Sequence, residues 1–123
     1  MKLGTDIIEI HRIQRAIEKS DTFLKRVFTP AEIEYCESKK KGRFQSYACM
    51  YAAKEAVLKA LGTGLRYGSW QDIEITHTAL GAPVVTLRST FLDIMKQQQL
   101  QDIIISISHC ERYAMSTVII KGE

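Results

Sequence analysis

Glu55 is an acidic residue in a stretch of sequence that contains few other polar residues. It lies in a helix-forming run, residues 47–61, where Lys54 and Lys59 are the only other formally charged groups and the rest are apolar, small, Tyr or Cys. A helix of this composition is expected to be buried on most of its circumference. A carboxylate held there needs a cation. That cation could be Lys59 at i+4, in an ion pair worth only ~0.2–0.5 kcal/mol if exposed, or a metal.

A second carboxylate, Asp6, favours the metal. Residues 3–13 alternate like a half-buried strand, which puts Asp6 on the same side as Ile8 and Ile10. If this strand packs on the alanine-rich side of the helix, Asp6 and Glu55 approach one another. Two carboxylates without a cation repel, whereas Mg²⁺ takes one or two carboxylates together with phosphate oxygens and water.

The elements that must position these acids can be read from local patterns. Thr29-Pro30 with Glu32 predicts a helix start, and Gly62 and Gly64 predict the end of the long helix. Glycines after a helix act more often as a C-terminal cap than in phosphate binding. The expected order is strand 3–10, helices 12–19, 30–39 and 44–61, strands 72–77 and 84–88, helix 89–98, and a closing hairpin of 102–109 and 112–121. This predicts an α+β fold with a long central helix packed on an antiparallel sheet.

Length and composition indicate one domain over residues 1–123, with 46% hydrophobic residues and no internal repeat or low-complexity linker. No charged-then-apolar leader and no apolar run of membrane-spanning length is present, so a cytoplasmic protein without a membrane span is expected. Cys36, Cys49 and Cys110 are odd in number and lack zinc-like spacing, which indicates reduced thiols.

The formal charge of +3 comes entirely from the first third of the chain. Residues 1–43 contain ten Lys or Arg and seven Asp or Glu, and the remainder contains seven of each. Arg12, Arg15 and Lys19 fall on one face of the expected helix 12–19, which indicates either a solvated surface or a docking face for an acidic partner. Residues 39–43 are also basic, but the cluster is short and has few aromatic residues for stacking, so nucleic acid is disfavoured.

Three segments carry a family resemblance: GTDIIEIHRI near the start, YAAKEAVLKALGTG in the middle and SISHCERYA near the end. In this order and spacing they resemble the holo-acyl-carrier-protein synthase group of 4′-phosphopantetheinyl transferases, from about residue 3 to residue 120. The resemblance implies a homotrimer with active sites at subunit interfaces. It also implies an enzyme of fatty acid biosynthesis that transfers the phosphopantetheine of coenzyme A to a serine of apo acyl carrier protein, releasing adenosine 3′,5′-bisphosphate.

The resemblance also implies roles for individual residues. Asp6 and Glu55 are expected to bind Mg²⁺ and, with Lys59, to form the catalytic set. The expected coenzyme-binding residues are Lys54, Lys59, Gly62, Ser108, His109 and Arg43, with Ser108 and His109 reaching the cleft from a neighbouring subunit. The expected carrier-docking residues are Arg12, Arg15 and Arg26. His109 alone, continuing an apolar row of a strand, would more often be structural, and only the matching segment favours phosphate binding.

Two features leave questions open. Most of the family has an Arg-Phe pair where this chain has Met50 and Tyr51, so a guanidinium that helps hold the coenzyme is missing; Arg43, Lys41 or Lys40 could replace it. The general base for the serine could be Glu55 or a metal-held water. A non-catalytic trimer that binds coenzyme A or carrier protein is the alternative to an enzyme, although such a module has no need of the paired acids.

Overall fold

The computed structural model describes residues 1–122, and its centre is a three-stranded antiparallel sheet. The strand order is β1 (Lys2–Glu9), β5 (Tyr113–Lys121) and β4 (Asp102–His109). Burial alternates along each strand, so the sheet has an inner face and an outer face. Asp6 pairs directly with Ser116, and both side chains belong to the inner face.

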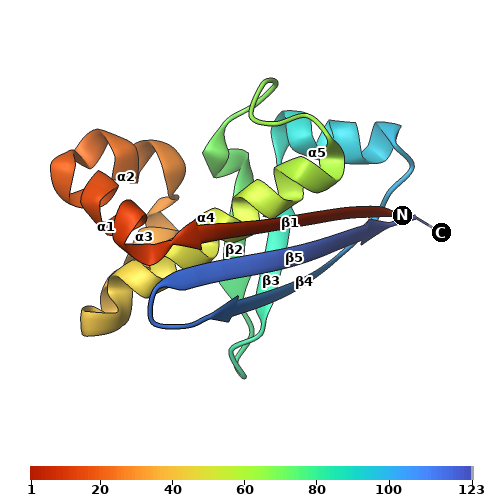
Figure 1. Cartoon of the computed structure of the whole chain (residues 1–123). Coiled ribbons are helices and arrows are strands. Elements are labelled where there is room, and N and C mark those ends of the chain that lie inside the picture. The colour runs from red at the N-terminus through yellow and green to blue at the C-terminus, as the bar shows by residue number, and fades with distance from the viewer. Residues whose placement is uncertain (123) are drawn as a thin grey trace.

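The long helix α4 (Arg43–Leu61) crosses the inner face of this sheet, as Figure 1 shows. At about 1.5 Å per residue its 19 residues span nearly 30 Å. The alanine side of α4 allows a close approach, because a Cβ at Gly4 would collide with the backbone at Ala56 and Ala60. The predicted packing of the N-terminal strand against the alanine-rich helix is therefore confirmed.

The remaining elements surround this core. Shorter helices gather at the N-terminal half of α4 (Figure 1), and a separate hairpin lies beside α4 with its second strand in contact with β4. The helices are α1 (Ile10–Lys19), α2 (Asp21–Val27), α3 (Pro30–Ser38) and α5 (Ser89–Gln97), with 3₁₀ turns η1 (Lys40–Gly42) and η2 (Trp70–Asp72). The hairpin strands are β2 (Ile73–His77) and β3 (Pro83–Leu87).

The α+β fold predicted from the sequence is confirmed, with element ends displaced by one or two residues. Thr29 and Glu32 form a capping box at α3, and Gly62 ends α4 in the left-handed conformation at φ 78°. One helix, α2, was not predicted. Ser20 ends α1 and also caps α2, accepting a hydrogen bond from the Thr22 N–H. Within residues 1–122 no helix is long and apolar enough to cross a lipid bilayer.

Candidate active site

Asp6 lies at the edge of the sheet with its carboxylate largely covered. Lys59 Nζ, on the last turn of α4, donates to Asp6 Oδ1 at 2.9 Å. The Asp6 side chain is 12% exposed and that of Lys59 is 52% exposed. The second oxygen, Asp6 Oδ2, is buried and has no hydrogen-bond partner among residues 1–122. A buried carboxylate oxygen without a protein donor is expected to bind an ordered water or an ion.

Glu55 projects from α4 toward the same place. Burial raises the pKa of the Glu55 carboxyl, and the negative charge of Asp6 raises it further. Lys59 and the nearby Tyr51 hydroxyl act in the opposite direction on this pKa. The two acids therefore sense each other's charge, and Lys59 is the cation shared between them.

These residues fit a divalent cation of the hard, oxygen-binding kind. Asp6 offers a free buried oxygen, and Glu55 is a partly desolvated carboxylate that an added positive charge would stabilise. No cluster of three or more His, Cys, Asp or Glu side chains suited to a metal occurs within residues 1–122. Mg²⁺, which keeps several waters and shares phosphate oxygens with its substrate, suits a site with two protein carboxylates.

Lys54 has a different role from the one expected. Its side chain is fully buried, and Nζ donates to Glu32 Oε1 at 2.7 Å, to Val27 O at 2.6 Å and to Trp70 O at 3.1 Å. An ammonium has three donors, and all three are used. The prediction that Lys54 faces coenzyme phosphates is therefore wrong, because this side chain has neither exposure nor a free donor.

Instead, the buried Lys54–Glu32 pair fastens α4 to the surrounding elements. Glu32 accepts hydrogen bonds from the Thr29 N–H at 2.8 Å through Oε1 and from the Ile75 N–H at 2.8 Å through Oε2. The pair thus joins α4, α3, the end of α2 and β2. Because Glu55 follows Lys54 directly, this anchor fixes the helix that carries the metal candidate.

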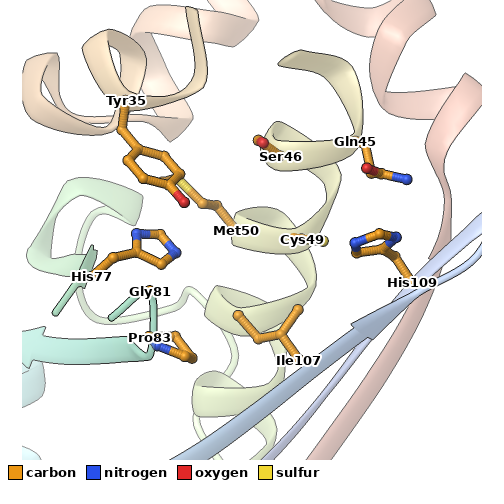
Figure 2. Close-up of a pocket in the computed structure, with 10 residues that line it drawn as sticks. All are labelled: Tyr35, Gln45, Ser46, Cys49, Met50, His77, Gly81, Pro83, Ile107 and His109. Carbon is orange, nitrogen blue, oxygen red and sulfur yellow. The ribbon is translucent and has the colours of Figure 1, made fainter. Parts of the chain in front are cut away.

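A second polar site lies near the N-terminal half of α4, shown in Figure 2. It is a cavity of about 220 Å³. His77 and Tyr35 stack at 4.0 Å on one side, and His109 faces them from the other, across Met50 and Cys49 (Figure 2). Burial, assisted by the charge of Lys39, lowers the pKa of His77, so this wall is a neutral planar surface.

The expected coenzyme-binding residues therefore form two groups within one chain. Lys59 and the exposed Gly62 lie at the C-terminal end of α4. His109 lies beside the N-terminal half of α4, and Ser108 faces the outer side of the sheet. Arg43 begins α4, where its Nε is 3.8 Å from Glu37 Oε1 and its guanidinium covers the Phe44 ring. Glu55 is twelve residues further on, about 18 Å along the helix axis.

The basic surface predicted on the first helix is exposed and extends to α2. Arg12, Arg15 and Arg26 are all exposed, and none of them has an acidic partner within 4 Å in residues 1–122. The charge of Arg12 acts on the Tyr51 hydroxyl in the direction that lowers its pKa, against burial and the two carboxylates, which raise it. Arg12 is therefore within electrostatic range of the acidic site.

The sequence assigns no site role to Tyr51 and gives Glu32 only a place in the helix start after Thr29. Tyr51 is four residues before Glu55, a spacing that brings two side chains together on a helix, so its contact was visible in the sequence. Glu32 is 22 residues from Lys54, and no local pattern connects them.

Comparisons with known proteins agree with this architecture. The family model described as the 4′-phosphopantetheinyl transferase superfamily matches residues 2–118. A holo-[acyl-carrier-protein] synthase of Ruminiclostridium cellulolyticum is 48% identical over 122 residues, covering 98% of this chain and 91% of the relative. The corresponding synthase of Moorella thermoacetica is 43% identical over 122 residues, 99% and 94% of the two chains.

Solved structures agree as well. The holo-[acyl-carrier-protein] synthase of Helicobacter pylori, solved in complex with coenzyme A, superposes with a TM-score of 0.84 at 33% identity, covering 97% of this chain and 99% of that one. The synthase of Neisseria meningitidis gives a TM-score of 0.87 at 32% identity, with 98% and 97% covered. Fold, sequence and paired acids thus point the same way: the chain belongs to the 4′-phosphopantetheinyl transferase superfamily, as an enzyme of its holo-[acyl-carrier-protein] synthase group.

Proposed function

We propose that this transferase moves the phosphopantetheine arm of coenzyme A to a serine hydroxyl of apo acyl carrier protein, with Mg²⁺ held by Asp6 and Glu55. The observation that carries the proposal is the carboxylate pair, in which Asp6 Oδ2 is buried without a partner and Glu55 is partly desolvated beside it. When bound, Mg²⁺ would neutralise and align the diphosphate, which is most of what phosphoryl transfer demands.

Lys59 supports this chemistry from the protein side. Its ammonium is 2.9 Å from Asp6 and half-exposed, so it can reach a phosphate while remaining next to the carboxylates. A positive charge fixed there stabilises negative charge on the diphosphate as its bond breaks. Glu55 is also the carboxylate of this site that could accept the serine proton.

The cavity beside His109 is proposed to hold the nucleotide end of the coenzyme. His77 and Tyr35 give it a flat stacked wall, and His109 adds a polar group opposite. Met50 stands where a guanidinium is usual and offers no charge. Lys39, whose Nζ lies 4.7 Å from the Tyr35 ring centre, is a basic side chain beside this wall, so it is a further candidate beside Arg43 for the phosphate contact.

We propose a homotrimer in which each active site uses two subunits. The outer face of the sheet exposes apolar side chains across neighbouring strands: Leu3, Ile7, Ile104, Tyr113 and Met115. An exposed apolar sheet face of this kind marks an interface. Ser108 and His109 border the same face, in a small apolar depression with Ile7 and Met115. A subunit packed there could bring its His109 cavity to the Asp6–Glu55 pair of its neighbour.

The exposed basic face of α1 and α2 is proposed to receive the carrier protein. Arg12, Arg15 and Arg26 have no acidic partner in residues 1–122, and Arg12 is within electrostatic range of the carboxylate site. An acidic carrier would be oriented by such a face, and the effect would weaken with salt. We further propose that residues 1–123 form one transferase domain acting in cytoplasmic fatty acid biosynthesis, in keeping with three free cysteines.

The activity test is direct. The protein is mixed with apo acyl carrier protein, coenzyme A and Mg²⁺, and the carrier is weighed by mass spectrometry. A mass increase of one phosphopantetheine group is expected, and Asp6→Ala and Glu55→Ala should each abolish it while the protein stays folded. Carriers from several sources that all remain unmodified would refute the proposal.

A mixing experiment tests the shared site. Asp6→Ala and His109→Ala subunits, each inactive alone, are unfolded and refolded together. If each site combines two subunits, about a quarter of the sites in random mixed trimers are intact, and activity should reappear. A mixture as inactive as its components would contradict a site shared in this way.

A further inference from the structure

Ser116 is a fully buried polar residue that the proposed chemistry does not use. Its side chain is 0% exposed, and its Oγ has no hydrogen-bond partner among residues 1–122. Buried hydroxyls nearly always have a partner, and one without it points to a bound water or ligand. Its inner-face neighbours on the same strand, Ala114 and Val118, are buried and apolar.

The register of the sheet places this hydroxyl next to the metal candidate. Ser116 on β5 is the direct cross-strand partner of Asp6 on β1. Directly opposed residues of an antiparallel pair point to the same face, with Cβ atoms about 4.5–5.5 Å apart. Among residues 1–122, Asp6 Oδ2 is the other buried side-chain polar atom on this face without a hydrogen-bond partner. Two side chains with an unsatisfied polar atom thus lie opposite one another on the inner face, and Ser116 can donate where the Asp6 carboxylate can only accept.

We propose that Ser116 is a positioning residue of the metal site, whose hydroxyl and Asp6 Oδ2 hold one water molecule between them. This inference rests on the proposed function, because it assigns Asp6 to the cation. The Ser116 O–H would donate to the water, and the water would donate to one lone pair of Oδ2. The second lone pair of Oδ2 would remain for the ion, and the Asp6 carboxylate would be held in one orientation toward it. Groups that orient a metal-binding side chain in this way influence metal affinity, and their loss typically weakens metal binding about 10–100-fold.

The substitution Ser116→Ala separates this role from a structural one. Alanine removes the hydroxyl without overfilling the site and relieves a buried group that lacks a protein partner. The variant should therefore melt at the same temperature as the parent protein or higher when no metal is present. It should also bind Mn²⁺ at least about tenfold more weakly. A residue that only supported the fold would show a lower melting temperature.

The experiment is a Mn²⁺ titration of the full chain, followed by the loss of the free-ion EPR signal. Three variants accompany the parent protein: Ser116→Ala, Asp6→Ala, and Thr86→Ala as an exposed hydroxyl control on β3. Weaker binding by Ser116→Ala with unchanged binding by Thr86→Ala supports the inference. A Kd for Ser116→Ala within twofold of the parent, or a clear fall in its melting temperature, overturns it. If Asp6→Ala binds Mn²⁺ like the parent, the proposed metal site itself fails.

Discussion

Lys54 offers the sharpest test of the structural reasoning, because its two candidate roles predict different failures. The substitution Lys54→Met keeps the length of the side chain and removes the ammonium. Glu32 would then be a carboxylate with 0% exposure that has lost its cation. Breaking a buried ion pair by removing one partner costs about 3–5 kcal/mol.

That cost can be converted into a melting temperature. For a chain of this length, 1 kcal/mol corresponds to roughly 4 °C, so a fall of about 12–20 °C is expected. The assay is thermal and urea unfolding at a single protein concentration, since an oligomer's stability depends on concentration. Lys59→Met is the matched control on the same helix. Its ion pair is half-exposed on the lysine side, and we expect a loss of about 1 kcal/mol or less.

A second variant checks the physical cause. Adding Glu32→Gln to Lys54→Met removes the uncompensated charge, so the double variant should be more stable than Lys54→Met alone, a non-additive result. A phosphate-binding lysine would behave differently: Lys54→Met would melt like the parent protein and only the KM for coenzyme A would rise. That outcome would refute the assignment of Lys54 as a buried anchor.

Three further predictions concern the carboxylate site and its surroundings. Burial and the charge of Asp6 raise the pKa of Glu55, so the folded protein favours the protonated carboxyl and loses stability as pH rises through that pKa. Glu55→Gln should therefore raise the melting temperature at neutral pH and give no gain below about pH 4. An equal gain at both pH values would contradict this. Arg12→Glu should raise the KM for carrier protein at least about tenfold and leave the KM for coenzyme A nearly unchanged, whereas equal effects would argue against docking there. Lys59→Met should lower kcat by about 10²-fold. It should not weaken Mn²⁺ binding, because the Lys59 ammonium and the ion compete for the Asp6 carboxylate. Weaker Mn²⁺ binding by the variant would show that Lys59 only orders that carboxylate.

Much of the fold could be predicted from the sequence because its signals are local. The capping box at Thr29, the alternation around Asp6 and the left-handed glycine at position 62 each act within a few residues. Helix α2 was missed because seven residues are too few to show helical periodicity, and its only clear signal is the Ser20 cap. The division of the strands into a three-stranded sheet and a separate hairpin depends on long-range pairing, which no local pattern encodes.

The candidate site likewise contains residues that local sequence patterns identify and residues that only the tertiary structure identifies. Asp6 and Glu55 stood out because each is an acid on an apolar face, and the structure brings them into mutual electrostatic range. Lys54 also lies in the middle of the apolar face of α4, which by itself indicates an inward direction, whereas the motif indicates phosphate binding. Its partner Glu32 and the cross-strand neighbour Ser116 are determined by tertiary packing and register, and neither can be found from spacing alone.

The most direct test of the metal assignment is crystallographic. Crystals of the full chain grown with coenzyme A and Mn²⁺ are measured near the manganese absorption edge, and the anomalous difference map is inspected. We predict one strong peak bonded to oxygens of both Asp6 and Glu55 and to a phosphate oxygen of the coenzyme. A peak bonded to other residues, or none at either carboxylate while the coenzyme is clearly bound, would contradict the account.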